Sequence, residues 1–171
     1  MSQTPYTLAP LKVGHDRSHF RSGSEQLDYY LREQVTQDIR RRVATCFVAL
    51  EERERIIGYY TLAPASVPLT SLPLERRKKL PRYPAVPTVR MGRLAVDQAF
   101  QGIGLGGALL TDAIDRTMRA EIASYALLVD AKNDDAAAFY RHHGFISLPD
   151  TPLILFLPFS SVNRLGKGED R

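Results

Sequence analysis

LAVDQAFQGIGLGGALL, residues 94–110, is the most informative stretch of this chain. An apolar run precedes Gly102, Gly104, Gly106 and Gly107, and an apolar helical pattern follows them. Glycine permits positive φ and lets a ligand approach the backbone, while the first turn of a helix offers unpaired N–H groups. The stretch therefore predicts an anion site at a strand-to-helix turn, and pyrophosphate is the usual occupant of such sites.

Other interpretations of this glycine-rich turn have to be weighed. The letters GIGLGG formally match the dinucleotide-binding pattern G-x-G-x-x-G. The acid expected about 20 residues later is supplied only loosely by Asp130, and the chain is short for a dinucleotide domain. The phosphate-binding pattern G-x-x-x-x-G-K-[ST] is absent from the sequence. A plain tight turn with a helix cap remains the structural alternative.

Hydrophobic patterns on both sides of the turn predict alternating strands and helices. We expect strands at 6–13, 43–50, 55–63, 88–97, 125–131 and 152–158, and helices at 25–42, 103–122 and 134–143. The second and third strands, joined by EERE at 51–54, predict an antiparallel hairpin. Residues 64–87 hold six of the eleven prolines and are expected to be mostly loop, with a short helix at 74–80. This order predicts one mixed α/β domain over 1–160 and a flexible tail over 161–171.

Length and composition narrow the class of protein. A chain of 171 residues that is 44% hydrophobic fits one folded domain. The sequence has no apolar run of about 18 residues and no secretory signal pattern at its start, so we expect no membrane span and no export. The single cysteine, Cys46, lies in an apolar run and is expected to be a buried, inert thiol. A lone cysteine is typical of a cytoplasmic protein.

Positive charge is concentrated in one part of the chain. The net charge is +4, and the segment from Pro73 to Arg93 holds seven basic residues against one acid, Glu75. Such a block indicates a phosphate-rich partner, although a solvated loop kept soluble by charge is the plainer alternative. The basic residues are Arg76, Arg77, Lys78, Lys79, Arg82, Arg90 and Arg93.

Three segments together resemble the GNAT N-acetyltransferase superfamily. They are RLAVD (93–97), QGIGLG (101–106) and NDDAAAFYRHHGF (133–145), in the order and spacing of that family. The resemblance implies a mixed, mostly antiparallel, twisted sheet flanked by helices, splayed between the strands at 88–97 and 125–131, and acetyl-CoA as co-substrate. The residues that it implies for binding acetyl-CoA are Leu94, Ala95, Val96, Gln101, Gly102, Ile103, Gly104, Leu105, Gly106, Gly107, Asn133 and Phe139.

A narrower resemblance covers nearly the whole chain. The segments 20–50, 56–67 and 92–113 are similar to the GNAT toxins of bacterial type II toxin–antitoxin modules, which acetylate the amino group of aminoacyl-tRNA and stop translation. FRSG at 20–23 departs from the family pattern, because a cysteine is expected before the glycine. The resemblance implies a DNA-binding antitoxin of the ribbon-helix-helix class and a homodimer. The residues implied for tRNA binding are Arg77, Lys78, Lys79, Arg82, Arg90 and Arg93.

Tyr140 is the candidate catalytic residue. Acetyl transfer from a thioester to an amine requires a proton or a hydrogen bond for the leaving thiolate, and a phenol with a pKa near 10 can donate one. The resemblance implies that Tyr140 is the general acid, whereas a packed aromatic is the structural alternative. Phe139 is better suited to packing, since adjacent helical positions point about 100° apart. His142 and His143 are expected at the surface, and no spacing indicates a metal site.

Two rival functions remain open from the sequence. The first is a GNAT enzyme that acetylates protein N-termini or small amines, against which the basic block argues weakly. The second is a module that binds coenzyme A or nucleic acid without catalysis. The amino acid and the tRNA that a toxin of this kind would select are not readable from the residues.

Overall fold

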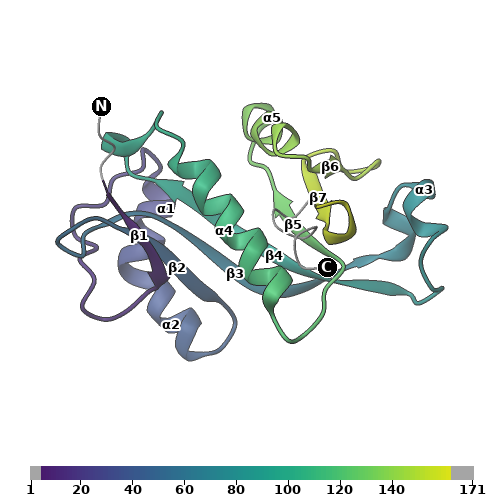
Figure 1. Cartoon of the computed structure of the whole chain (residues 1–171), viewed down its shortest axis with the longest axis horizontal. Helices are drawn as coiled ribbons and strands as arrows, with labels where there is room; N and C mark the ends of the chain where they lie inside the picture. The colour runs from purple at the N-terminus through teal and green to yellow at the C-terminus, as the bar shows by residue number, and fades with distance from the viewer. Residues whose placement is uncertain (1–4, 163–171) are drawn as a thin grey trace, which may run out of the picture. The chain divides into compact units, whose positions relative to one another are not determined.

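The computed structural model describes residues 5–162, in which seven strands form one sheet in the order β1-β2-β3-β4-β5-β7-β6 (Figure 1). The pairs β1–β2, β2–β3, β5–β7 and β6–β7 are antiparallel, and β4–β5 is parallel, so the sheet is mixed. The strands are β1 Thr7–Pro10, β2 Thr45–Leu50, β3 Ile56–Pro68, β4 Ala85–Val96, β5 Ala126–Asp130, β6 Ile146–Ser147 and β7 Ile154–Pro158. The α-helices are α1 Glu25–Tyr29, α2 Val35–Arg40, α3 Leu74–Arg77, α4 Leu105–Arg119 and α5 Asp134–His142.

The chain is divided into two compact units. Within the described residues the first unit comprises 5–64 and 90–119, and the second comprises 65–89 and 120–162. Strands β3 and β4 each contribute residues to both units. Of the tail expected at 161–171, the part from residue 163 onward lies outside the described residues.

In the first unit, helices cover both faces of the sheet (Figure 1). One face of β2 and β3 packs on α1 and α2, and its core contains Leu31, Val35, Val48 and Tyr59. The other face packs on α4, where the Tyr60 hydroxyl donates to an Asp112 carboxylate oxygen at 2.7 Å. The neighbouring residues Tyr59 and Tyr60 thus face opposite sides of the sheet, as successive residues of a strand do. The antiparallel pairing of β2 with β3 confirms the hairpin predicted for 43–63.

The helix predicted at 25–42 is not continuous. A π-helical turn, Tyr30–Gln34, separates α1 from α2, and the Val35 N–H donates to the Tyr30 carbonyl five residues earlier. The apolar residues that led to the prediction do face the core: Leu31 and Val35 are fully buried, and Leu27 and Ile39 pack against them. The segment is therefore helical and amphipathic as expected, but it carries one widened turn.

In the second unit, a core forms where a loop was predicted. Val67, Leu72 and Val86 are buried there together with residues of β5 and β7. The expectation that 64–87 is mostly loop was wrong at both ends, because β3 extends to Pro68 and β4 begins at Ala85. Proline lacks an N–H but keeps its carbonyl, and Pro87 accepts a hydrogen bond from Tyr125 at 2.8 Å. The short helix expected at 74–80 is present as α3.

The remaining elements follow the sequence prediction. Strand β5 is buried along Ala126–Val129, as its unbroken apolar run indicates, and it pairs with β7. Helices α4 and α5 lie within their predicted ranges. The two-residue strand β6, which pairs with β7, was not predicted.

Candidate functional site

The glycine-rich turn of the first unit has the geometry of an anion site. Gly102 and Gly104 have φ of +82° and +87°, a conformation that favours glycine. A Cβ on either would meet no atom within 4 Å, so space is open beside the backbone. The first α4 hydrogen bond runs from Ala108 N–H to the Gly104 carbonyl, which leaves the N–H groups of Leu105, Gly106 and Gly107 without an intrahelical partner. These features fit the pyrophosphate that the sequence predicts.

Gln101 fixes the start of this turn. Its side-chain amide donates to the Val96 carbonyl at 2.9 Å and to the Ser22 carbonyl at 3.0 Å. Gln101 was predicted to bind the coenzyme, and its side chain is engaged with these two backbone carbonyls. Its contribution is thus to hold the turn between the end of β4 and the segment around Ser22.

Asp97 is a second anchor of the turn and was not among the residues predicted for the site. The side chain is buried and accepts from the backbone N–H of Arg21 at 3.1 Å and of Ala99 at 2.9 Å. An aspartate directly after a strand, ahead of a short helical turn, is the signal that could have identified it.

The end of β4 leads into the turn. Ala95 is buried in the core, while Leu94 and Val96 are half-buried. Just before them, the guanidinium of Arg93 lies 3.5 Å from the centre of the Tyr30 ring. Arg93 therefore packs against the π-helical segment as well as carrying charge.

In the second unit, α5 is capped at both ends as its sequence indicates. The Asn133 side-chain oxygen accepts from the Ala136 N–H at 2.9 Å, and Asp134 and Asp135 lie in the first turn. Gly144, with φ of +95°, follows the last turn. Asn133 is exposed, so its side chain caps the helix from the protein surface.

Tyr140 lies near the end of α5 in an aromatic cluster. Its ring centre is 5.3 Å from that of Phe139 and 5.4 Å from that of Phe145. Burial raises the pKa of Tyr140 to about 12, so the phenol is neutral at physiological pH and keeps its proton. No residue within 5–162 forms a hydrogen bond with its hydroxyl group. The hydroxyl is therefore available as a donor to a ligand.

The two histidines after Tyr140 differ in environment. His143 Nδ1 lies 2.9 Å from the Phe139 carbonyl oxygen, and the two rings are 4.7 Å apart. His143 thus contacts Phe139, while His142 is exposed. Across the described part of the chain, no group of three His, Cys, Asp or Glu side chains is arranged to hold a metal ion.

The predicted tRNA-binding residues fall in both units. Arg77, Lys78, Lys79 and Arg82 belong to the second unit, and all but the half-buried Arg77 are exposed. Arg77 also donates to the Thr70 carbonyl at 3.3 Å. Arg90 and Arg93 belong to the first unit and are half-buried.

Cys46 is confirmed as a buried thiol. It is 4% exposed, and burial raises its pKa to about 12, which suppresses the reactive thiolate. Every helix within the described range is too short or too polar to traverse a lipid bilayer.

Comparison with known proteins identifies the family. The acetyltransferase (GNAT) family model matches residues 13–145. A tRNA-acetylating toxin of Mycobacterium tuberculosis is 40% identical over 161 residues, which cover 92% of this chain and 95% of that protein. Among solved structures, AtaT in complex with acetyl-methionyl-tRNAfMet is similar, with a TM-score of 0.86 and 30% identity over 92% of this chain and 96% of that chain.

A second solved structure adds two ligands to this comparison. It contains a tyrosine-to-phenylalanine variant of the AtaT toxin bound to the C-terminus of the antitoxin AtaR and to acetyl-CoA. Its TM-score is 0.75 and its identity 26%, over 92% of this chain and 95% of that chain. The family model and the Mycobacterium relative confirm the resemblance predicted from the sequence. The chain belongs to the acetyltransferase (GNAT) family.

Proposed function

We propose that this protein is an acetyl-CoA-dependent N-acetyltransferase that acetylates the α-amino group of aminoacyl-tRNA and acts as the toxin of a type II toxin–antitoxin module. The observation that carries the proposal is the 40% identity to a tRNA-acetylating toxin along 92% of the chain. The open glycine-rich turn at the start of α4 supports it, because it fits the pyrophosphate of the co-substrate.

The glycine-rich turn and the end of β4 bind acetyl-CoA in this proposal. The N–H groups of Leu105, Gly106 and Gly107 and the positive end of the α4 dipole hold the pyrophosphate, with Gly102, Ile103 and Gly104 shaping the loop. The backbone of Leu94, Ala95 and Val96 pairs with the pantetheine amides and offers a donor to the developing oxyanion. Bound acetyl-CoA supplies a thioester whose carbonyl carbon the amine attacks.

Tyr140 serves the leaving group. A neutral phenol donates a hydrogen bond or a proton to the departing thiolate, and the free hydroxyl of Tyr140 supports this role. Its raised pKa of about 12 exceeds that of a thiol, about 8.5, so a hydrogen bond that stabilises the thiolate is easier than complete proton transfer. Asn133 and Phe139 contact the coenzyme arm in the same proposal, in addition to their capping and packing contacts.

The acceptor amine requires little help from the protein. An aminoacyl α-amine has a pKa near or below about 8, so a useful fraction is already neutral at pH 7. Holding the neutral amine beside the thioester then supplies much of the rate increase. A strong general base is therefore not part of the proposed mechanism.

Basic side chains bind the RNA in this proposal. Lys78, Lys79 and Arg82 are exposed and suited to phosphate contacts, and Arg77, Arg90 and Arg93 extend the set. Binding through phosphates releases counterions, so the affinity should fall steeply with salt.

The proposal also includes a partner and an assembly. The AtaT relative binds the C-terminus of the antitoxin AtaR. We expect a cognate DNA-binding antitoxin here, of the ribbon-helix-helix class and encoded by a neighbouring gene. A homodimer in the cytoplasm completes the proposal, because two copies enlarge the basic surface available to tRNA.

The test is a comparison of acceptors. Purified protein is incubated with labelled acetyl-CoA and, in parallel, with charged tRNA, peptides with free N-termini and small amines. We expect label on charged tRNA and none on tRNA from which the amino acid has been removed. Label on peptides or small amines alone would favour the rival GNAT activity instead.

A further inference from the structure

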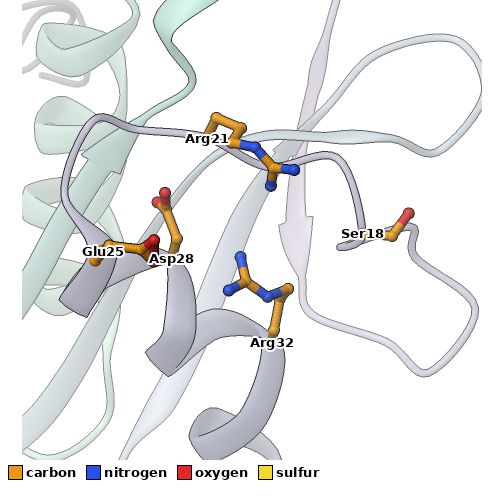
Figure 2. A pocket seen from close by; sticks show the side chains of 5 residues that line it. All are labelled: Ser18, Arg21, Glu25, Asp28 and Arg32. Atoms are coloured by element: carbon orange, nitrogen blue, oxygen red, sulfur yellow. The ribbon is translucent and has the colours of Figure 1, made fainter.

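A polar pocket of about 430 Å³ lies in the first unit, and none of the residues that line it belongs to the glycine-rich turn. It is lined by Ser18, Arg21, Glu25, Asp28 and Arg32, which come from the loop before α1, from α1 itself and from the π-helical turn (Figure 2). Neither the glycine motif nor the basic block at 73–93 includes these residues. The pocket is thus a separate feature that the proposed chemistry does not use.

Two arginines of the pocket face each other without an acidic partner. Figure 2 shows the guanidinium groups of Arg21 and Arg32 pointing into the same space. Among the described residues, neither forms an ion pair, and the one hydrogen bond of their side chains is a long contact of 3.5 Å from Arg21 to the Phe20 carbonyl. Two converging cations with unused donors favour an anion between them, and planar guanidiniums suit phosphate.

The acids on the other side of the pocket restrict the kind of anion. Asp28 is buried, and its Oδ1 accepts from both the backbone N–H (3.0 Å) and the hydroxyl (2.6 Å) of Ser22, which leaves Oδ2 free to accept from a ligand. Glu25 lies beside it. Carboxylates repel an acidic peptide but accept hydrogen bonds from sugar hydroxyls or base amino groups. The pocket also far exceeds the roughly 30 Å³ of one water, so it has room for more than a phosphate.

We propose that this Arg21–Arg32 pocket binds one nucleotide of the RNA substrate, with the phosphate between the two guanidiniums and the sugar or base toward Asp28 and Glu25. The inference rests on the proposed function, since it assigns the nucleotide to the acceptor RNA. The pocket is joined to the coenzyme turn by hydrogen bonds: Gln101 donates to the Ser22 carbonyl, and the Arg21 N–H donates to Asp97. A nucleotide held here is therefore anchored to the segment that leads into the turn.

The experiment compares single charge removals that are matched in net charge. Arg21→Gln and Arg32→Gln each remove one pocket cation, and Arg53→Gln removes an exposed arginine of the 51–54 turn that lies outside the pocket. Binding of uncharged tRNA is measured as Kd by fluorescence anisotropy over a series of salt concentrations. We expect each pocket variant to weaken binding about tenfold and to lower the salt slope by about one, and Arg53→Gln to do neither.

One further measurement identifies the source of the nucleotide. The Kd for coenzyme A, measured by calorimetry, should be unchanged in both pocket variants. A weaker Kd for coenzyme A with an unchanged Kd for tRNA would overturn the inference, because the nucleotide would then belong to the co-substrate. Equal tRNA affinity in the pocket variants and the wild type would also overturn it.

The proposed function and this inference fail in different ways. If the wild type acetylates charged tRNA and the pocket variants retain wild-type KM for it, only the pocket assignment is wrong. If the wild type acetylates no aminoacyl-tRNA, the proposed function is wrong, and so is the assignment to acceptor RNA. Arg21 lies exposed on a loop, so Arg21→Gln keeps the test decisive if Arg32→Gln does not fold.

Discussion

The guanidinium of Arg93 lies 3.5 Å from the centre of the Tyr30 ring, and the Tyr30 hydroxyl donates to Asp38 at 2.7 Å. Tyr30 opens the π-helical turn, Asp38 belongs to α2, and Arg93 belongs to β4. This one side chain therefore connects the widened helical turn to the strand that leads into the glycine-rich turn. Substitutions at Tyr30 can therefore measure separately the hydrogen bond to Asp38 and the cation–π contact with Arg93.

Two substitutions at Tyr30 should measure these two contributions to stability one at a time. Tyr30→Phe keeps the ring under Arg93 and loses the hydrogen bond to a carboxylate, so we expect a loss of about 1–2 kcal/mol in unfolding free energy. Tyr30→Leu also loses the cation–π contact and should cost more, by about 1 kcal/mol beyond ordinary packing losses. Urea unfolding measures both, with the half-exposed Tyr29→Phe as control. Equal losses in the two variants would contradict a stabilising stack.

Gly104→Ala should weaken acetyl-CoA binding without a steric clash inside the protein. A Cβ at this position meets no atom within 4 Å, but φ of +87° strains any residue other than glycine. The strain of about 1–2 kcal/mol shifts the turn from its binding geometry, and we expect the KM for acetyl-CoA to rise about tenfold. Gly14→Ala, where a Cβ also has open space and φ is not positive, is the matched control. An unchanged KM would show that the turn does not bind the pyrophosphate.

Two substitutions at Asn133 separate its capping contact from its proposed coenzyme contact. Asn133→Ala removes the bond to the Ala136 N–H and should lower the unfolding free energy by about 1 kcal/mol. Asn133→Asp keeps a cap and suits the helix dipole, so its stability should equal that of the wild type. A raised KM for acetyl-CoA in Asn133→Asp, at unchanged stability, would then report the loss of the amide together with the added negative charge, and not the loss of the cap. If both variants match the wild type in unfolding free energy, the Asn133 cap does not stabilise the fold.

Stability should fall at alkaline pH because buried tyrosines resist ionisation. Burial raises the pKa values of Tyr30, Tyr59, Tyr60 and Tyr140 above their usual 10, and Tyr140 reaches about 12. Above pH 10 the unfolded chain loses phenolic protons that the folded chain keeps, so the stability that the buried tyrosines contribute is full below pH 10 and declines as the pH rises from there. The buried Cys46 thiol, whose pKa burial also raises, adds a decline that begins at lower pH, near the value of about 8.5 of a free thiol. Each tyrosine contributes a slope of about 1.4 kcal/mol per pH unit once its unfolded form is ionised.

Chemical denaturation between pH 8 and 11 measures that slope. Tyr140→Phe should reduce it by the share of one tyrosine, while Tyr83→Phe, whose ring is 68% exposed, should leave it unchanged. A slope that is the same in all three proteins would contradict the burial of the Tyr140 phenol.

The sequence predicted those parts of the fold that depend on local signals. The glycines at 102–107, Asn133 and Gly144 mark helix ends through the backbone geometry that they permit, and the structure places α4 and α5 where these residues indicate. The unbroken apolar run of β5 likewise requires burial on both faces. These features can be predicted without knowing which residues far apart in the chain are in contact.

The π-helical turn depends on a detail of spacing that the prediction passed over. Leu27, Leu31, Val35 and Ile39 recur at every fourth position, and each such step turns an α-helix about 40° beyond a full turn. Over the segment the apolar stripe would drift by about 120°, and one widened turn takes up part of that excess. Apolar residues at strictly every fourth position were therefore the sequence signal for a π-helical turn.

Long-range contacts account for what the sequence could not predict. The prolines at 64, 68 and 87 favoured a loop, yet they lie in strands β3 and β4. A proline in a strand has no N–H to donate, but its carbonyl can still accept a hydrogen bond. Gln101 matches a coenzyme motif but donates to Ser22, 79 residues away in the chain. The pocket between Arg21 and Arg32 likewise depends on how a loop and a widened helical turn fold together.

Tyr140→Phe should separate catalysis from binding. The ring keeps its packing on Phe139 and Phe145, so folding and the Kd for acetyl-CoA should stay within twofold of the wild type. Loss of the hydroxyl removes the donor to the thiolate, and we expect kcat to fall about 10²-fold or more. His142→Gln, at an exposed position on the same helix, is the matched control. Unchanged turnover in Tyr140→Phe would exclude the acid role.

Mass spectrometry of the aminoacyl end tests the proposed reaction most directly. Charged tRNA is incubated with acetyl-CoA and the wild-type protein and then digested with nuclease to release the aminoacyl-adenosine. The proposal predicts a mass gain of one acetyl group on the amino acid portion, with the tRNA nucleotides unchanged. Aminoacyl-adenosine that remains unmodified for every amino acid, under conditions in which the protein binds acetyl-CoA, would contradict it.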